Sequence, residues 1–256
     1  MSPILKNINI SAAIVSYNSA PLTKKACESI LKNTLGRELS LYVFDNGSDD
    51  GTKEALKGEN LSFVEIGKNI GFGAAHNKIF NYEMGEYHFI INPDIEISSD
   101  VLSGIADFMD ENPDIALLMP RILNFDKTEQ YLPKRRPTAK YLFLGRLAGV
   151  FKSCGRIRDE YTRKNDNLDT VTDIDFCSGC FMCIRSEVFK ALGGFDERFF
   201  MYLEDADLTL RAQSYGRTVI APQFEVTHMW DRSSAKKLKY FLIHLSSAFK
   251  FLFKRK

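Results

Sequence analysis

Short apolar runs alternate with amphipathic stretches through the first part of the chain, and this alternation constrains the fold more than any other feature. The apolar runs are ISAAIV, LSLYVF, LSFVEI and YHFIIN. Between them lie helical patterns at Pro21 to Lys32, near Thr52 to Leu56 and from about Gly73 to Tyr82. Strands that alternate with helices predict crossover connections. We therefore expect an α/β fold with a mainly parallel central sheet flanked by helices.

Length and charge narrow the classes of function. At 256 residues with 45% hydrophobic residues, the chain can form one large domain or two small ones with a sizeable core. Its formal net charge of +1 argues against a general binder of polyanions, so no nucleic-acid partner is expected. The start, MSPILKNINISAAIVSYN, lacks the pattern of a secretory leader, and no apolar window reaches the length of a bilayer span. These features predict a cytoplasmic location.

The cysteines fit reduced thiols better than a disulfide framework, because the chain holds five of them. Cys177, Cys180 and Cys183 have a spacing that zinc or iron–sulfur sites also use, but the other two cysteines are distant in the sequence. The run GCFMCIR is typical of a buried strand. We expect three small buried residues rather than a metal site.

Polar residues follow three of the apolar runs at the point where each run ends. In a parallel sheet, ligands bind beyond the carboxyl ends of the strands, so these residues are candidates for a binding site. If the strands are neighbours, two carboxylates converge on one crevice and favour a cation or a ligand rich in hydroxyl groups. The alternative is three ordinary turns. The residues concerned are Ser16, Tyr17 and Asn18, then Asp45, Asn46, Gly47 and Ser48, and then Asn92, Pro93 and Asp94.

A glycine-containing stretch, NIGFGAAHN at residues 69 to 77, resembles a phosphate-binding loop in part. It lacks the full dinucleotide-binding spacing, and it has no P-loop lysine followed by serine or threonine. We expect Gly71 and Gly73 to permit a tight loop against a bound ligand, with a plain turn into a helix as the alternative.

Three carboxylates follow directly on a bulky apolar run in FFMYLEDADLTLR, residues 199 to 211. An unpaired carboxylate is costly to bury, so Glu204, Asp205 and Asp207 either cap a helix or take part in chemistry. Acidic residues interact favourably with the first turn of a helix. On this stretch alone, the pattern favours capping.

Two regions carry an excess of positive charge. Residues 125–172 lack clear periodicity and hold ten basic residues against two acidic ones between Lys134 and Lys164. This region is interpreted either as a lid or binding loop or as a solvated basic surface. Beyond Asp231 the chain has no acidic residue. A helical pattern there fits an anionic membrane surface, with packing on the protein's own core as the alternative; its apolar stripe comprises Leu238, Phe241, Leu242, Leu245, Phe249 and Leu252.

The segments VSYN, VFDNGSDDGT, NIGFGAAHN, INPDI, GCFMCIRSEVFKALGGFDERFFMYLEDADLTLR and VTH occur in the order in which they occur in family-two glycosyltransferases. From about Ile8 to His228 the chain resembles these inverting enzymes of the GT-A fold, and among them bacterial rhamnosyltransferases of surface-polysaccharide assembly. The resemblance implies a transferase domain over 1–231, with a nucleotide-sugar-binding half at 1–98 and an acceptor-binding half at 99–231 that includes the basic loop 125–172. Residues 232–256 are expected to form a basic amphipathic helix.

The resemblance also assigns roles to residues. It implies that Asp94 holds Mg²⁺ or Mn²⁺ on the diphosphate of a nucleotide sugar and that His228 coordinates the same metal or contacts the diphosphate. Asp205 matches the general base, and Glu204 supports it or binds the acceptor, whereas Asp207 is expected to be structural. The residues implied to bind the nucleotide sugar are Ser16, Tyr17, Asn18, Asp45, Asn69, Gly71, Asn92 and Asp94.

The implied reaction is transfer of a sugar, with L-rhamnose from dTDP-L-rhamnose expected first, onto a lipid-linked or polysaccharide acceptor. Such a reaction belongs to bacterial O-antigen or capsule synthesis at the inner face of the cell membrane. Donors of UDP-linked galactofuranose, glucose or N-acetylhexosamine stay open, as does a non-catalytic nucleotide-sugar-binding module. A nucleotidyltransferase is disfavoured, because VSYNSAP stands where such an enzyme carries a glycine-rich loop with a basic residue.

Overall fold

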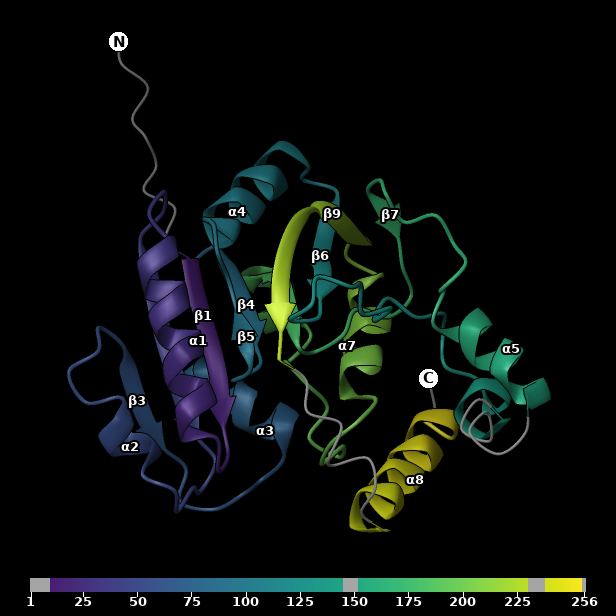
Figure 1. Cartoon of the computed structure of the whole chain (residues 1–256), viewed down its shortest axis with the longest axis horizontal. Coiled ribbons are helices and arrows are strands. Elements are labelled where there is room, and N and C mark those ends of the chain that lie inside the picture. The colour runs from purple at the N-terminus through teal and green to yellow at the C-terminus, as the bar shows by residue number, and fades with distance from the viewer. Residues whose placement is uncertain (1–9, 145–151, 230–237, 255–256) are drawn as a thin grey trace.

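A mixed sheet of nine strands forms the centre of the structure, a computed structural model that describes residues 10–144, 152–229 and 238–254 (Figure 1). The order of the strands is β3-β2-β1-β4-β8-β6-β9-β5, and β7 pairs with β9 beside this path. The strands are β1 (Ile10–Ser16), β2 (Leu39–Asp45), β3 (Ser62–Glu65), β4 (Tyr87–Ile91), β5 (Ile95–Glu96), β6 (Ile115–Leu123), β7 (Thr172–Asp173), β8 (Phe181–Arg185) and β9 (Arg217–His228).

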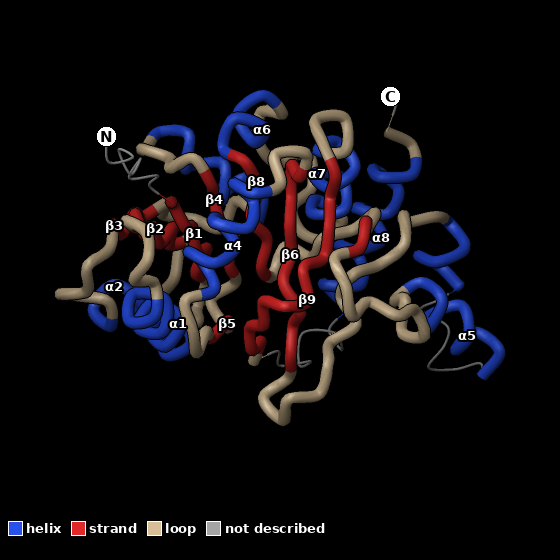
Figure 2. The backbone as a smooth tube through the Cα atoms, turned by 90° about the horizontal axis from the view of Figure 1, so that it is seen from above, coloured by secondary structure: helices blue, strands red, loops and turns tan. Residues whose placement is uncertain are grey.

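Helices cover both sides of this sheet, and α1 and α2 lie on the side opposite α6 in the view from above (Figure 2). The helices are α1 (Ala20–Asn33), α2 (Thr52–Ala55), α3 (Phe72–His76), α4 (Val101–Glu111), α5 (Lys152–Tyr161), α6 (Ser186–Ala191), α7 (Glu204–Ala212) and α8 (Leu238–Leu252). Two further helical turns are η1 (Asn77–Asn81) and η2 (Lys140–Leu144).

The N-terminal part confirms the predicted α/β pattern. Strand β1 pairs in parallel with β2 and β4, and β2 pairs in parallel with β3. All residues of β1 and β4 are buried, as expected of central strands covered on both faces. Helix α1 begins with proline in its first turn, where the missing N–H costs no hydrogen bond. The carboxyl ends of these strands therefore meet at one edge of the sheet.

The sheet also contains antiparallel strands that the sequence patterns did not predict. Strand β8 lies antiparallel between β4 and β6, and β5 and β7 each pair antiparallel with β9. The single helix expected from Gly73 to Tyr82 is divided into α3 and η1. At the junction, the side-chain amide of Asn77 donates to the carbonyl of Phe195 at 2.9 Å and accepts from its N–H at 2.8 Å. These two bonds hold the chain where the helix type changes.

The sequence showed no clear periodicity over residues 125–172, but this region contains the helical elements η2 and α5. Residues 145–151 lie outside the described part. Several basic side chains here are paired. Arg135 donates two hydrogen bonds of 2.9 Å to Asp166, and Lys140 lies 2.9 Å from Glu160. These pairs neutralise part of the positive charge that the sequence showed in this region.

Helix α8 packs on the protein with one face and leaves another face exposed. Its buried face joins an apolar cluster beside α5 and α7 (Figure 1), and Ser247 donates to the carbonyl oxygen of Met201 at 2.8 Å. Lys254 pairs with Asp196 at 2.8 Å and with Asp207 at 2.6 Å. The cluster consists of Leu142, Phe176, Phe199, Leu203, Ala206 and Ala248. Exposed on the helix are Leu238, Phe241, Leu242 and Phe249, all members of the predicted stripe.

A helix that crosses a membrane must be both long and apolar. Within the ranges that the structure describes, no helix is both long enough and apolar enough to cross a bilayer.

Candidate active site

A cavity of about 510 Å³ opens beyond the carboxyl ends of β1, β2 and β4, where it also meets the start of α7 and the end of β9. The position is the one expected for a ligand site on an open α/β sheet. Eight of the residues implied by the resemblance line this cavity, and three do not. Those that line it are Tyr17, Asn69, Gly71, Asn92, Asp94, Glu204, Asp205 and His228.

Asp94 and His228 face each other across the cavity wall, although 134 residues separate them in the chain. Asp94 precedes β5, and β5 pairs with the end of β9 so that Ile95 lies opposite His228. The N–H of Met229 donates to the carbonyl oxygen of Asp94 at 2.8 Å. The carboxylate oxygen Oδ1 of Asp94 lies 3.2 Å from Nε2 of His228. This backbone pairing brings the two side chains together.

The other ring nitrogen of His228 is held by Gln130. The side-chain amide of Gln130 donates to Oδ1 of Asn124 at 2.8 Å and to the carbonyl oxygen of His228 at 2.9 Å. Its oxygen therefore faces Nδ1 of His228, at 2.9 Å, and Nδ1 carries the proton. In the neutral ring, Nε2 then directs a lone pair at the Asp94 carboxylate. Two electron-rich atoms this close require a positive charge between them, either a proton on Nε2 or a metal cation.

The donor set fits a divalent cation that is completed by substrate. One carboxylate and one imidazole are available, and no group of three or more potential metal-ligating side chains occurs in the described parts of the chain. Mg²⁺ is commonly bound by one or two carboxylates together with waters and substrate phosphates. The pair of Asp94 and His228 is therefore suited to a metal that arrives with a diphosphate.

Asp45 lies outside the main cavity and lines a neighbouring hollow of about 260 Å³. Its Oδ2 accepts from the N–H of Ser48 at 3.1 Å, whereas its buried Oδ1 has no hydrogen-bond partner among the described residues. A buried acceptor without a partner is costly, and a ligand N–H or O–H group would satisfy it.

The first strand tip presents Tyr17 to the cavity, and this side chain is 49% exposed. The neighbouring side chains of Ser16 and Asn18 bond to the protein instead. Ser16 Oγ lies 2.8 Å from Oγ1 of Thr23, and Asn18 accepts from the N–H of Asp49 at 2.9 Å. The tip can thus offer a ring from Tyr17 and backbone groups from its neighbours.

Asn46, one of the polar residues at the tip of β2, lines the cavity, although the sequence assigned it no role of its own. Its side chain accepts from the N–H of Ile70 at 2.9 Å and donates to Oδ1 of Asn69 at 3.2 Å and to the carbonyl oxygen of Gly71 at 3.3 Å. Gly71 has a φ of +97°, and the N–H of Phe72 donates to the carbonyl oxygen of Phe200 at 3.0 Å. The glycine loop therefore docks against the segment that precedes α7.

We expect Gly71→Ala to destabilise the protein more than Gly58→Ala. Both glycines have a positive φ, but a Cβ at Gly71 would lie 2.5 Å from the carbonyl oxygen of Phe200, whereas a Cβ at Gly58 meets nothing within 4 Å. Gly71 also has a ψ of 167°, a conformation open almost only to glycine, so the difference combines backbone strain with the steric clash and is expected at about 1–3 kcal/mol. Urea unfolding of both variants measures it, and equal free energies of unfolding would contradict the close approach.

The start of α7 carries the two carboxylates Glu204 and Asp205 into the cavity. Tyr202 and Leu203, just before the helix, have φ values of +72° and +67°. A left-handed conformation is unfavourable for bulky residues, and such strain is typical of functional sites. Leu203 is buried in the apolar cluster, which holds the turn in place. Both acids lie in the first turn of α7 and also line the cavity, so their position is compatible with both a helix-capping role and a chemical one.

The surroundings of Glu204 and Asp205 change the pKa values of both carboxyl groups. Burial raises the pKa of Asp205, while Lys134 and two backbone N–H groups act in the opposite direction. Those N–H groups belong to Gly179 and Ala206, which donate to its carboxylate at 3.1 and 2.9 Å. Burial raises the pKa of Glu204 well above its ordinary range, and the charge of Asp205 adds to this effect. The pKa of Asp205 is thus raised on balance by burial, although two N–H groups donate to its carboxylate, and it lies beside a carboxyl group that favours its protonated form.

Two other sequence interpretations concern residues that flank the pair. Asp207 pairs with Arg211 at 2.8 Å, which confirms the expected structural role. Cys177, Cys180 and Cys183 are buried and free, as expected, and burial raises the pKa of Cys180 to about 12. A thiol with such a pKa is not a nucleophile near neutral pH.

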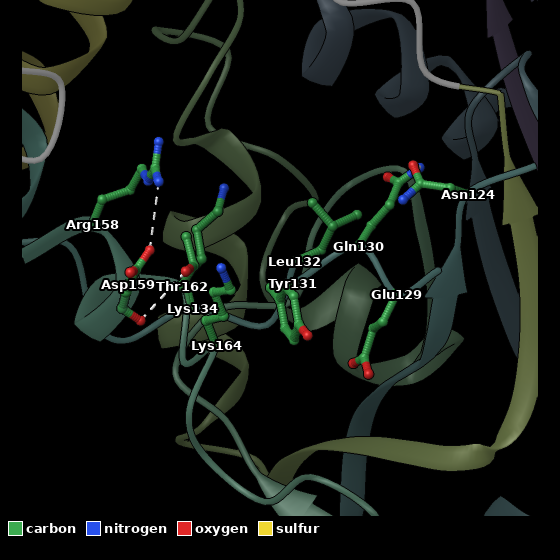
Figure 3. A pocket seen from close by; sticks show the side chains of 10 residues that line it. All are labelled: Asn124, Glu129, Gln130, Tyr131, Leu132, Lys134, Arg158, Asp159, Thr162 and Lys164. Carbon is green, nitrogen blue, oxygen red and sulfur yellow. Dashed lines mark hydrogen bonds and ion pairs between the residues drawn. The ribbon is translucent and has the colours of Figure 1, made fainter. Parts of the chain in front are cut away.

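A second hollow, also of about 510 Å³, adjoins the cavity, because Leu132 and Lys134 line both. Figure 3 shows the basic side chains of Lys134, Arg158 and Lys164 at one end of this hollow, with Asn124, Glu129 and Gln130 at the other. The walls come mainly from residues 125–172, which were interpreted from the sequence as a lid or binding loop or as a solvated basic surface, without any indication of which side chains would line a hollow.

The sheet, with its ligand site beyond the strand ends and a carboxylate pair at the start of α7, has the architecture of a GT-A glycosyltransferase. The chain belongs to glycosyl transferase family 2, whose model matches residues 11–193. This finding confirms the family and the fold that the sequence segments implied.

Two curated relatives are rhamnosyltransferases by name. The chain is 26% identical over 255 residues to an N-acetylglucosaminyl-diphospho-decaprenol L-rhamnosyltransferase of Mycobacterium tuberculosis, covering 93% of this chain and 82% of the relative. It is 25% identical over 254 residues to the rhamnosyltransferase WbbL of Escherichia coli, covering 95% of this chain and 92% of the relative.

Solved structures share the fold at lower identity. A mannosyltransferase of Pyrobaculum calidifontis in complex with GDP-Man and Mn²⁺ matches with a TM-score of 0.63 and 16% identity, over 94% of this chain and 64% of the solved one. GalNAc-T7 with UDP, GalNAc and Mn²⁺ matches with a TM-score of 0.64 and 12% identity, over 88% and 44%. This chain spans less than two thirds of either solved chain, and the likeness shows the fold.

Proposed function

We propose that this glycosyltransferase is a metal-dependent, inverting enzyme that moves L-rhamnose from dTDP-L-rhamnose to a lipid-linked or polysaccharide acceptor in bacterial surface-glycan synthesis. The observation that carries the proposal is the common cavity. Asp94 and His228 on one wall can hold a diphosphate through a cation, and Asp205 enters the same cavity from α7. In the proposed reaction, the base and the residues that hold the leaving diphosphate must lie around the same sugar.

Different residues of the cavity have different roles in the proposed reaction. Asp205 accepts the proton of the acceptor hydroxyl while that oxygen forms a bond to the anomeric carbon, and the bond from this carbon to the diphosphate oxygen breaks. The nucleoside diphosphate leaves with the electron pair of that bond. Glu204 lies beside the base and can bind the acceptor as a hydrogen-bond donor in its protonated form. Phe200, Met201 and Tyr202 line the cavity around them and limit the access of water.

The nucleotide is proposed to bind at the neighbouring strand tips. Tyr17 provides a ring for contact with the base, and the unsatisfied Oδ1 of Asp45 can accept from the base or ribose. Asn69 and Asn92 offer polar groups where the diphosphate enters. Mg²⁺ or Mn²⁺ held by Asp94 and His228 would neutralise the charge that develops on the leaving diphosphate.

The donor sugar is assigned from the names of the curated relatives, whereas the class of enzyme also rests on the family and the fold. The names of the curated relatives favour rhamnose, and the Mycobacterium relative acts by name on a diphospho-decaprenol acceptor. Transferases that use UDP-linked galactofuranose, glucose or N-acetylhexosamine share the same general architecture. A non-catalytic sugar-nucleotide-binding module is disfavoured, because Asp205 and the Asp94–His228 pair both line the cavity.

A transfer assay tests the reaction. The purified protein would be incubated with Mn²⁺, N-acetylglucosaminyl-diphospho-polyprenol and one donor at a time, with mass spectrometry of the extracted lipid. The proposal predicts a product that is heavier by one deoxyhexose with dTDP-rhamnose. A hexose product from a UDP donor would keep the mechanism and overturn the donor, and binding without transfer to any acceptor would favour the non-catalytic module.

We also propose that α8 contacts the inner face of the cell membrane. Its exposed apolar side chains continue onto η2, where the ring of Phe143 lies 6.1 Å from that of Phe249. Lys239 and Lys250 are exposed on the same helix. An apolar face flanked by lysines fits an anionic lipid surface. The exposed set is Phe143, Leu144, Leu238, Phe241, Leu242, Phe249 and Phe253, called here the apolar patch.

We expect the double variant Leu242→Glu with Phe253→Glu to bind phosphatidylglycerol vesicles at least about 10-fold more weakly than the wild type, because two apolar anchors of 1.5–3 kcal/mol each are lost. Both positions are exposed, so folding is retained. The matched control is Leu35→Glu with Phe125→Glu, which changes an exposed leucine and an exposed phenylalanine outside the patch. Vesicle flotation measures the bound fraction, and equal binding of both double variants would contradict the proposal.

A further inference from the structure

Lys134 occupies a position that the reaction as described does not use. It lies in an extended segment in which Gln130, Leu132 and Lys134 alternate with their neighbours, and its backbone forms a bridge with Phe176. Gln130 reaches His228, and Leu132 and Lys134 line the active-site cavity. The same two residues line the second hollow (Figure 3). The side chain of Lys134 thus stands at the border between the two spaces.

The ammonium group of Lys134 has aromatic neighbours rather than a carboxylate partner. Its Nζ lies 4.6 Å from the ring centroid of Phe176 and 5.9 Å from that of Tyr161. No carboxylate of the described residues lies within 4.0 Å of it, in contrast to Lys140, which pairs with Glu160 at 2.9 Å. Burial lowers the pKa of Lys134, and the charge of Asp205 opposes this shift. A partly buried cation without a contacting anion is suited to receive one from a ligand.

The chemistry of the cavity indicates which anion. Three protein carboxylates, Asp94, Glu204 and Asp205, line it, so an anionic ligand that binds there needs positive groups close by. A divalent cation held by Asp94 and His228 would compensate only part of the negative charge of a nucleoside diphosphate. Lysine binds phosphate as a mobile point charge, and positive groups placed on a departing phosphate lower the barrier to its departure.

We infer that Lys134 binds the diphosphate group of a substrate, an inference that rests on the proposed function. Two sources supply the same chemistry. The leaving nucleoside diphosphate lies in the active-site cavity, and the diphosphate of a lipid-linked acceptor fits the second hollow, where Arg158 and Lys164 add positive charge. Lys134 and Asp205 line the same cavity, and the charge of Lys134 lowers the pKa of that carboxyl group, so removal of Lys134 is also expected to affect the base.

Binding measurements test this inference directly. Isothermal titration with dTDP and Mg²⁺, and separately with farnesyl diphosphate, would compare the wild type with Lys134→Met, Lys134→Gln and Lys134→Arg. Lys140→Met is the matched control, because its ammonium group is exposed and already paired. We expect the neutral variants to bind one of the two diphosphates at least about 10-fold more weakly, with thymidine binding unchanged, and Lys134→Arg to retain most of the affinity.

The two probes distinguish the source, since weaker dTDP binding indicates the leaving group and weaker farnesyl diphosphate binding indicates the acceptor. If the wild type binds both probes and both neutral variants bind them equally well, Lys134 has no such role and the inference is wrong, while the proposed function stands. If the wild type binds neither probe, the proposed function fails and the inference fails with it. Folding of each variant is checked by its thermal transition, and Lys134→Gln serves if Lys134→Met does not fold.

The pH dependence of kcat separates this role from a purely structural one. Asp205 must be ionised to accept a proton, so kcat falls as the pH decreases through its pKa. Lys134 lowers that pKa, so its removal raises it. The acid limb of the profile is therefore expected at higher pH in Lys134→Met and at its original position in Lys140→Met. An unmoved acid limb in Lys134→Met would contradict the electrostatic link. The charged or titratable groups that interact with Asp205 are Glu204, Lys134, Tyr161, Cys177 and Cys180.

Discussion

Asp205→Asn is expected to lower kcat by about 10²–10⁴-fold, the usual contribution of a general base, while binding of the donor stays within about twofold of the wild type. An asparagine keeps one oxygen that can accept from the N–H of Gly179 but loses the second acceptor, which faces the N–H of Ala206, so the thermal transition of the variant is measured beside its activity. It cannot take a proton from the acceptor hydroxyl. Steady-state kinetics, together with titration of dTDP, measures the two quantities separately.

The control for this variant is Asp175→Asn, which removes an exposed carboxylate outside the cavity and should leave kcat unchanged. Glu204→Gln provides a further comparison. Because Glu204 favours its protonated form, the amide should retain more activity than Asp205→Asn. If Asp205→Asn transfers sugar at the wild-type rate, Asp205 is not the base and the proposed mechanism is wrong.

Asp94→Asn is expected to abolish the effect of Mg²⁺ or Mn²⁺ on nucleotide binding and to lower kcat/KM by at least about 10²-fold. A metal supplies several kcal/mol of charge stabilisation at a departing diphosphate, and each 1.36 kcal/mol corresponds to a factor of ten in rate. The variant keeps the size of the side chain but removes the negative charge that faces His228 at 3.2 Å. Titration of dTDP with and without metal is the direct measurement.

Asp114→Asn is the matched control, because this exposed carboxylate pairs with Arg217 and lies outside the cavity. Its metal dependence should equal that of the wild type. If Asp94→Asn still binds dTDP more tightly with metal than without it, the cation site lies elsewhere. In that case a proton on Nε2 of His228, rather than a metal, balances the carboxylate of Asp94.

The parts of the site that follow from parallel strand pairing could be predicted from the sequence. The apolar runs ending in Ser16, Asp45 and Ile91 belong to β1, β2 and β4, which are hydrogen-bonded neighbours. Parallel strands end at the same edge, so residues at the tips of β1 and β4 reach one cavity. Asp45 at the tip of β2 lines a neighbouring hollow instead, so its expected convergence with Asp94 in one crevice was wrong. The order of the quoted sequence segments, through the resemblance to family-two transferases, indicated the residues on the acceptor side of the site.

Other parts depend on pairings between distant segments that no local pattern indicates. Asp94 meets His228 because β5 pairs antiparallel with β9, and Gln130 reaches the same histidine from a loop. Lys134 enters the cavity through its bridge with Phe176, 42 positions further along the chain. Asn46 looked like an ordinary turn residue beside Asp45, although its place in a strand tip was a signal that could have identified it.

The C-terminal helix illustrates a different limit. Its periodicity predicted an apolar stripe, but not which face would pack on the protein. The small residues Ser247 and Ala248 face the protein, where Ser247 bonds to Met201. The larger apolar residues of the stripe stay mostly exposed. Close packing at this contact favours small side chains, and an amphipathicity argument from the sequence ranks large apolar residues first.

The measurement that tests the central claim most directly is the thermal stability of the protein with nucleotide sugars, in the presence of Mn²⁺ or of a chelator. A ligand that binds only the folded state raises the melting temperature. The account predicts that dTDP-rhamnose with Mn²⁺, at 100 times its dissociation constant, raises it by about 5 °C or more, and that chelation or Asp94→Asn removes the effect. Stabilisation that does not depend on metal would contradict the role of Asp94 and His228, and no response of the folded protein to dTDP-rhamnose or any UDP-sugar would contradict the assignment of this cavity to a nucleotide sugar.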